Sequence, residues 1–194
     1  MSEQNPWSFL GVTTAFENPW FRVEEQEVID PAGAQRTYGI IRFRKIAVGV
    51  LPIDDGGNVH MVGQWRVPLA QYSWEMPEGG CEPGEAPLDC ARRELEEEAG
   101  VTARSFVKIL EMDLSNSVTD EKAVLYLATG IEGGTANPEP VEVLSNRLVP
   151  FREVLADVAE GRIRDSLTVA AVLRAYHMAK SGALDPVLAK AMLD

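Results

Sequence analysis

Three glutamates, Glu94, Glu97 and Glu98, are spaced so that a helix would bring their carboxylates together. They lie in the stretch GGCEPGEAPLDCARRELEEEAGV, residues 79–101, where a glycine-rich turn runs into an acidic segment. Like charges at these spacings destabilise a helix by about a few tenths of a kcal/mol per pair. A hard divalent cation such as Mg²⁺, which prefers oxygen ligands, would offset that repulsion. The alternative for such a run, taken alone, is an exposed acidic helix face.

The element that must position these carboxylates can be predicted from the same stretch. Pro87 suits the first turn of a helix and Gly100 suits a left-handed stop, so we expect a helix over residues 87–99. Ala91 and Leu95 are four residues apart and would face the core, whereas the glutamates fall on a different face.

The whole segment resembles the Nudix box at every signature position, namely Gly79, Glu85, Arg93-Glu94-Leu95, Glu97-Glu98 and Gly100-Val101. The resemblance implies a hydrolase of a nucleoside diphosphate linked to another group, on an α/β/α sandwich with a mixed sheet. It implies Mg²⁺ as cofactor, with Mn²⁺ as a substitute, held by Glu94, Glu97 and Glu98. It also implies that Arg93 orients the carboxylates and that the main-chain carbonyl of Glu78 is a further ligand.

Length and charge bound the remaining function classes. A chain of 194 residues with 45% hydrophobic residues is long enough for one folded domain with an appendage. A net charge of −12 argues against a nucleic-acid-binding surface, because phosphate backbones need Lys and Arg to replace their counterions. A polyphosphate substrate would then be bound at one local site, by a metal ion and a few arginines.

The two cysteines, Cys81 and Cys90, suggest neither a disulfide framework nor a zinc site, and we expect them to be reduced. The first ten residues lack a basic region followed by an apolar run, and no stretch reaches the roughly 18 apolar residues of a membrane span. We therefore expect a cytoplasmic protein with no membrane partner.

Around the acidic helix the pattern predicts mostly strands. We expect residues 1–18 to form a loose arm and residues 130–140 a flexible acidic loop. We expect strands 21–29 and 36–44 to form one hairpin, and strands 46–53 and 59–65 to form a second. Further strands are expected at 74–76, 106–112, 123–128 and 142–149. The expected later helices are 151–161 and one capped by Asp165 that runs to Lys180. We divide the chain into an arm with an antiparallel hairpin, residues 1–45, and a hydrolase domain, residues 46–194.

Motifs outside the box resemble the ADP-ribose and nucleotide-sugar pyrophosphatase branch of the Nudix family. They are the N-terminal hairpin, then Gln64-Trp65-Arg66, then Trp74-Glu75-Met76-Pro77. In that branch the N-terminal strands exchange across a homodimer and their aromatic side chains sandwich the adenine. Trp20 and Tyr38 fall where those aromatics would be; alternatively, both are ordinary hairpin residues packed on the sheet.

Arg66 is our candidate for gripping the diphosphate, because it ends a strand before the box and a guanidinium can bind phosphate oxygens with two bonds. The alternative is a surface ion pair. Glu75 would point to the metals or to a ribose hydroxyl, or else be a buried carboxylate paired to an arginine.

A general base that assists the attacking water is harder to find. In the resembled branch a glutamate from a late loop can do so, and Glu139 is our first choice and Glu142 our second; either could equally be a solvated loop acid. His60 and His177 show no connection to the box, and we expect both to be structural.

Two departures from the branch bear on the substrate. Asn116 stands where ADP-ribose enzymes commonly have a proline, and Glu78 replaces a residue that is often small. We expect hydrolysis of ADP-ribose or a related ADP-sugar to a nucleoside monophosphate and a sugar phosphate. The rivals are a hydrolase of nucleoside triphosphates or dinucleoside polyphosphates, and a Nudix-fold sensor that binds a nucleotide sugar without cleaving it.

Overall fold

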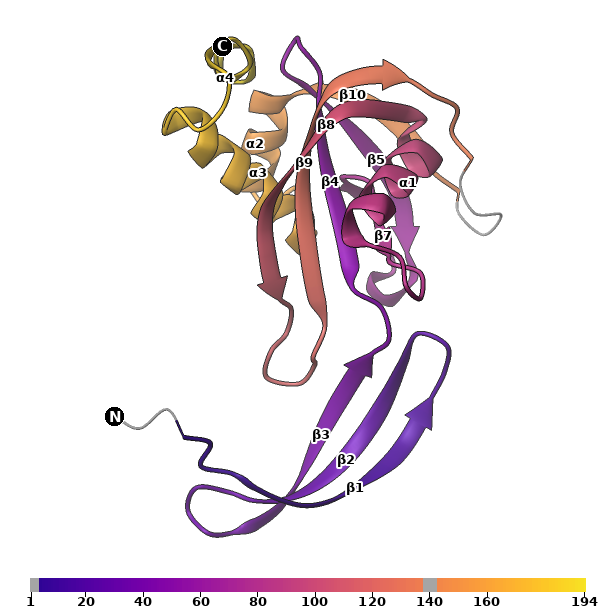
Figure 1. The fold of residues 1–194 in the computed structure, drawn as a ribbon, viewed down its shortest axis with the longest axis vertical. Helices are drawn as coiled ribbons and strands as arrows, with labels where there is room; N and C mark the ends of the chain where they lie inside the picture. Colours follow the sequence, from indigo (N-terminus) through magenta and orange to yellow (C-terminus); the bar gives the residue numbers. More distant parts are fainter. Residues whose placement is uncertain (1–3, 138–142) are drawn as a thin grey trace. The chain divides into compact units, whose positions relative to one another are not determined.

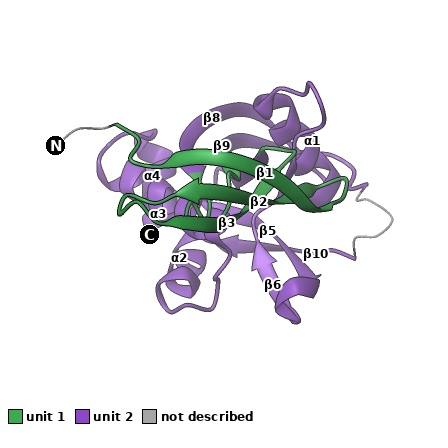
Figure 2. Ribbon diagram, turned by 90° about the horizontal axis from the view of Figure 1, so that it is seen from below, with its two compact units in different colours: residues 1–46, 113–122 green, residues 47–112, 123–194 purple. Residues whose placement is uncertain are grey.

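The computed structural model describes residues 4–137 and 143–194, and the chain divides into two compact units (Figure 2). Unit 1 comprises residues 1–46 and 113–122, and unit 2 comprises residues 47–112 and 123–194. The predicted fold class is confirmed: unit 2 is a mixed sheet between helices, and unit 1 is an antiparallel sheet. Within the described ranges, no helix is both long and apolar enough to cross a membrane.

Unit 1 is built on a three-stranded antiparallel sheet in the order β1-β2-β3, formed by β1 (Ser8–Glu17), β2 (Phe21–Ile29) and β3 (Gln35–Phe43). The hairpin predicted for the second and third strands is confirmed, in a register that runs from Phe21↔Phe43 to Ile29↔Gln35. Its turn closes through a bond from Gly33 N to Asp30 O, with Gly33 at φ +87°, a conformation that favours glycine.

The expectation of a loose arm over residues 1–18 is wrong. β1 pairs with β2 from Ser8↔Ile29 to Glu17↔Arg22, with register shifts near Leu10 and Ala15. Every residue of β1 is exposed, so neither face imposes the apolar alternation by which a strand is recognised in sequence.

The loop at residues 113–122 belongs to unit 1 because it bonds to β3. Thr119 forms an isolated parallel bridge with Ile41, and the Tyr38 hydroxyl donates to Ser117 O at 2.7 Å. Asp120 accepts from Phe43 N at 2.9 Å. Asn116, noted for its departure from the branch, therefore lies in a loop fixed to the N-terminal sheet.

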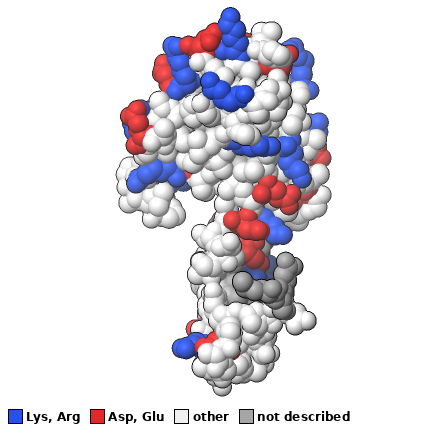
Figure 3. All heavy atoms as spheres, turned by 90° about the vertical axis from the view of Figure 1, so that its left-hand side faces the viewer, with Lys and Arg blue, Asp and Glu red and all other residues white. Residues whose placement is uncertain are grey.

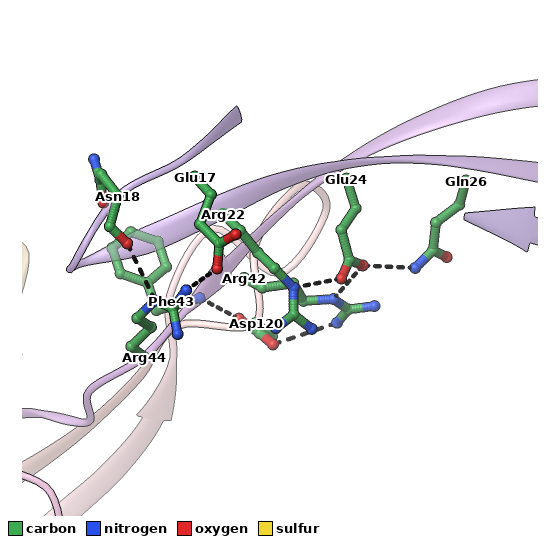
Figure 4. Close-up of polar contacts among 9 residues, drawn as sticks. All are labelled: Glu17, Asn18, Arg22, Glu24, Gln26, Arg42, Phe43, Arg44 and Asp120. Carbon is green, nitrogen blue, oxygen red and sulfur yellow. Dashed lines mark hydrogen bonds and ion pairs between the residues drawn. The ribbon is translucent and has the colours of Figure 1, made fainter. Parts of the chain in front are cut away.

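A cluster of charged and polar side chains lies along the strands of unit 1 (Figure 4). Glu24 accepts from Arg22 Nε at 2.6 Å, from Arg42 Nε at 3.1 Å and from Gln26 Nε2 at 3.0 Å. The hydrogen bonds from the two arginines lower the pKa of the Glu24 carboxyl to about 2, despite its burial. Glu24 is therefore ionised at neutral pH and can only accept hydrogen bonds.

Unit 2 holds a seven-stranded sheet whose main path runs β10-β5-β4-β9-β8, with β6 paired to β5 and β7 paired to β4. Its strands are β4 (Ala47–Ile53), β5 (Asn58–Arg66), β6 (Gln71–Glu75), β7 (Glu78–Gly80), β8 (Val101–Asp113), β9 (Lys122–Gly133) and β10 (Ser145–Pro150). The strands of the second predicted hairpin are present, but they pair only at Ile53↔Val59. β4 instead runs parallel to β9, a pairing between distant segments that local turn chemistry does not reveal.

Helices cover both faces of this sheet (Figure 1). α1 (Pro87–Ala99) lies on one face, and α2 (Phe151–Ala159) and α3 (Ser166–Lys180) on the other. The side chain of Asp165 accepts from Thr168 N, so the predicted cap of α3 is confirmed. A short 3₁₀ turn, η1 (Val67–Leu69), and a last helix, α4 (Pro186–Leu193), were not predicted.

The predicted acidic loop at residues 130–140 is only partly a loop. β9 continues to Gly133, and only residues 134–137 of the described part lack regular structure. The strand expected at 142–149 begins at Ser145, and residues 138–142 lie outside the described residues.

Thr168 links α3 to the chain just before the box. It is fully buried, and its hydroxyl accepts a hydrogen bond from Met76 N at 3.0 Å. Thr168→Val leaves that buried N–H unpaired, so we expect the free energy of unfolding to fall by about 1–3 kcal/mol. Thermal or urea denaturation measures this, and Thr168→Ser, which keeps the hydroxyl, serves as the control. A valine variant as stable as the serine variant would contradict the assignment.

Candidate functional site

The carboxylates of Glu94 and Glu98 lie buried on α1, where the helix approaches β7. Glu98 is 2% exposed and Glu94 8%. Glu98 Oε2 accepts from Glu78 N at 2.9 Å, which ties the backbone of β7 to the helix. A Cβ atom at Gly79 would stand 2.1 Å from Glu94 Oε1, so only glycine lets the strand pass this carboxylate. The prediction for this helix matches the structure at its two ends, including the stop at Gly100 with φ +66°. It also matches in the burial of Ala91 and Leu95.

Arg93 lies among the acids of the box. Its Nη1 donates to Glu94 Oε1 at 2.7 Å and to Glu97 Oε2 at 3.0 Å. Its Nε and Nη2 form a two-bond pair with Glu85, both at 3.0 Å. These bonds lower the pKa of Glu85 to about 2. One guanidinium thus contacts three carboxylates from the loop and the helix.

The two cysteines are unpaired and buried, and they lie beside this arginine. The sulfur atoms of Cys81 and Cys90 and a carboxylate oxygen of Glu85 lie within 4.8 Å of one another. Arg93 binds Glu85 and also donates to the Cys90 sulfur at 3.5 Å, so a cation already stands beside this group. The arrangement is therefore poorly suited to a second, metallic cation.

The carbonyl end of α1 is bonded to a much later part of the chain. Gly134 N donates to Gly100 O at 2.9 Å and Asn137 N donates to Glu97 O at 3.0 Å. Across the gap in the described residues, the Asn146 side chain donates to Glu98 O at 3.0 Å. Both ends of the segment that follows β9 are thus fixed to the helix that carries the carboxylates.

A cavity of about 720 Å³, lined mostly by polar and charged residues, adjoins the box loop in unit 2. Its lining combines the η1 turn, β6, the start of β7 and the N-terminus of α3, and comprises Arg66, Pro68, Leu69, Gln71, Ser73, Glu75, Glu78, Arg164, Asp165 and Ser166. The cavity contains the predicted Arg66 and Glu75. Arg164, Asp165 and Ser166 were not predicted as site residues, because only the tertiary fold brings α3 to β6.

Arg66 is already paired within this cavity. Its Nε lies 3.0 Å from Glu75 Oε1, and its Nη2 lies 2.5 Å from Glu75 Oε2 and 2.9 Å from Glu78 Oε1. Glu75 is 2% exposed, so the structure shows the buried carboxylate–arginine pair that was one alternative for Glu75. A phosphate would have to share the Arg66 guanidinium with these two glutamates.

The side chain of Glu78 distinguishes this cavity. Its Oε2 atom is buried and has no hydrogen-bond partner among the described residues. Burial, followed by the negative charges of Asp165 and Glu75, raises the pKa of the Glu78 carboxyl well above its usual range. Only its backbone was predicted to take part in the site, and that backbone contacts Glu98 through its N–H.

The remaining predicted residues are scattered. Trp20 and Tyr38 both lie in unit 1, exposed to 64% and 37%. Arg44 N bonds to Trp20 O, and Tyr38 precedes Arg44 by six residues, so the two aromatic residues are about 20 Å apart along the sheet. Two aromatics so placed in one chain cannot enclose the same base. His60 is in β5 and His177 in α3, while Glu139 and Glu142 lie outside the described residues.

The oxygen-rich donor set of α1 suits a hard divalent cation. Glu94 and Glu98 present carboxylates beside a backbone that glycine keeps close, and Glu97 flanks them on the same helix. Carboxylate and carbonyl oxygens are the ligands that Mg²⁺ and Mn²⁺ accept.

On the face drawn in Figure 3, basic and acidic side chains are interspersed among the described residues, so positive charge is not gathered there into one large patch.

An α/β/α fold with an oxygen-rich carboxylate helix can hold a divalent cation of the kind that hydrolases of phosphate anhydrides use. The sequence model of the NUDIX domain matches residues 43–169, well over half of the chain. The chain therefore belongs to the Nudix family and is a Nudix pyrophosphatase.

Curated relatives cover most of the chain. An ADP-ribose pyrophosphatase of Mycobacterium tuberculosis is 32% identical, over 86% of this chain and 81% of its own. An ADP-sugar pyrophosphatase of Mus musculus is also 32% identical, over 84% and 82%. A crystal structure of an ADP compounds hydrolase superposes with a TM-score of 0.84, over 94% of this chain and 98% of its own, at 21% identity. That structure supports the fold.

Gly79 tests the geometry of the carboxylates. Gly79→Ala would push a methyl group into Glu94, so we expect kcat to fall about 100-fold, because shifts near 1 Å at a catalytic group have effects of that size. The matched control is Gly133→Ala, since a Cβ there meets nothing within 4 Å. Steady-state hydrolysis with circular dichroism measures both; equal activity of the two variants would rule out a close approach at Gly79.

Proposed function

We propose that this protein hydrolyses the pyrophosphate bond of a nucleoside diphosphate sugar, with ADP-ribose or a related ADP-sugar as the first choice. The observation that carries the proposal is the buried pair Glu94 and Glu98 beside Gly79, next to a polar cavity large enough for a ligand. The names of the two relatives described above support the ADP-sugar class.

The reaction is the addition of water across a P–O–P bridge. The water oxygen forms a bond to one phosphorus, and the bond from that phosphorus to the bridging oxygen breaks. The products are a nucleoside monophosphate and a sugar phosphate, and the proton released from water must be accepted by a base. Glu139 and Glu142 are proposed for that role, in the order predicted from sequence.

Glu94, Glu97 and Glu98, with the main-chain carbonyl of Glu78, would hold Mg²⁺. When bound, such ions neutralise a diphosphate and lower the pKa of a coordinated water. Arg93 fixes the carboxylate positions, since it bonds to both Glu94 and Glu97. Arg66 is proposed to contact the substrate phosphate through guanidinium hydrogens that Glu75 and Glu78 leave unused.

We also propose a homodimer, supported by the surface of β1. This strand of ten residues pairs only with β2 in the described sheet, so its other edge is open. It exposes Phe9 to 63%, Val12 to 61% and Phe16 to 53%. A long apolar edge strand is a site at which another chain can pair or pack.

The predicted cytoplasmic location is kept as a proposal and rests on the two unpaired, buried cysteines.

The rival substrates are tested by a single panel with Mg²⁺: ADP-ribose, ADP-glucose, GDP-mannose, diadenosine polyphosphates and nucleoside triphosphates. Preference for ADP-ribose or ADP-glucose supports the proposal. Preference for triphosphates, or binding of a nucleotide sugar without its cleavage to a nucleoside monophosphate and a sugar phosphate, would overturn it.

Glu98→Gln tests the metal site directly. The amide keeps the size of the side chain but loses the charge that would hold a cation, so we expect kcat to fall at least about 100-fold. The matched control is Glu96→Gln, an exposed residue on the same helix. The rate of product formation at saturating Mg²⁺ is measured for both variants. An unchanged rate for Glu98→Gln would refute the assignment.

Val12→Lys tests the dimer. A charge in the middle of the exposed β1 surface should weaken association, so we expect the mass from light scattering to shift from dimer to monomer at micromolar concentration. Lys122→Glu, a charge change outside β1, is the control. A wild-type chain that elutes as a monomer would contradict the proposal.

A further inference from the structure

The short segment 76–78, which leads into the box, is held from both faces of the unit 2 sheet. The hydroxyl of Thr168 on α3 accepts a hydrogen bond from Met76 N at 3.0 Å. The carboxylate of Glu98 on α1 accepts from Glu78 N at 2.9 Å. α1 and α3 lie on opposite faces of the sheet (Figure 1). Two helices on different faces are therefore joined through three residues of backbone.

The backbone between these two hydrogen bonds has little freedom. Met76 is fully buried, and a Cβ at Gly49 would stand 2.2 Å from its side-chain methyl, so the methionine packs directly over that glycine. Pro77 has a restricted φ, and it also restricts the residue before it. The carbonyl of Pro77 accepts from Val50 N at 2.9 Å. A displacement of the Met76 amide is therefore passed on to the Glu78 amide.

The hydroxyl of Thr168 is not needed by α3 itself. The start of this helix is already capped by Asp165, whose carboxylate accepts from Thr168 N at 2.7 Å. Thr168 is fully buried, and a buried hydroxyl is costly unless it is hydrogen-bonded. The partner that it has is a backbone amide 92 positions earlier in the chain. The hydroxyl therefore serves the segment that leads into the box.

We propose that Thr168 is a positioning residue for the cation site of α1: by holding Met76 N, it fixes the backbone of Glu78 against the carboxylate of Glu98. The inference rests on the proposed metal site and extends it to the other face of the sheet. Thr168 lies outside the lining of the large cavity, so its effect on the site passes through the segment 76–78. Groups that orient metal ligands typically contribute about 10–100-fold in metal affinity or activity.

The test is calorimetric titration of Mn²⁺ into the metal-free protein, without substrate. We expect Thr168→Val to weaken Mn²⁺ binding about tenfold, and Thr168→Ser, which keeps the hydroxyl, to bind as the wild type does. Thr168→Ala is a second variant without the hydroxyl. It places no methyl group against the Met76 amide, so it keeps the test decisive if the valine variant does not fold.

The matched control is Val172→Ala, about one turn further along α3. Val172 is fully buried, so its truncation destabilises the core while the hydrogen bond from Met76 N to Thr168 is kept. We expect this variant to bind Mn²⁺ with wild-type affinity. The stoichiometry of each titration gives the fraction of folded protein.

The pattern of affinities separates positioning from a structural role. Weaker binding in Thr168→Val and Thr168→Ala, with wild-type affinity in Thr168→Ser and Val172→Ala, supports the inference. Equal affinity in all four variants overturns it, even where stability falls. Equal weakening in Thr168→Val and Val172→Ala also overturns it, because general destabilisation then accounts for the effect. Failure of the wild type to bind Mn²⁺, or wild-type affinity in Glu98→Gln, overturns the proposed metal site and the inference with it.

Discussion

The contact of one guanidinium with three carboxylates makes the acidic helix compatible with a folded chain. Arg93 bonds to Glu85 in the loop and to Glu94 and Glu97 on α1, so it joins the two halves of the box. Burying Glu94 and Glu98 without nearby positive charge would be costly. The arginine therefore holds Glu94 in place relative to Glu85 and Glu97, and Gly79 passes close to the carboxylate held in this way.

Local signals predicted a large part of the fold and of the box. Pro87 and Gly100 marked the ends of α1, and Asp165 marked the start of α3, because caps are encoded within a few residues. β1 was missed because its strand pairing is with β2 and it buries neither face, so its sequence carries no apolar alternation. The parallel pairing of β4 with β9 joins segments more than seventy residues apart, which no short-range pattern specifies.

In the candidate site, too, local features could be predicted from sequence and tertiary contacts could not. Carboxylates on one helix could be placed from their spacing, whereas the cavity needed β6 and α3 to meet. Arg66 could be nominated for its chemistry, but its double pairing with Glu75 and Glu78 is a tertiary fact.

The carbonyl end of α1 is hydrogen-bonded to two described parts of a later segment, residues 134–137 and Asn146, and these bonds have a consequence for local opening. Glu97, Glu98 and Gly100 each offer a carbonyl to a partner from that later segment. The last turn of the helix cannot fray without releasing these bonds, and the segment cannot detach without exposing the carbonyls. Opening of the last helical turn is thus coupled to the release of residues 134–137 and of Asn146. The last turn of the helix, which carries Glu97 and Glu98, is in this way held partly by described residues about forty positions further along the chain.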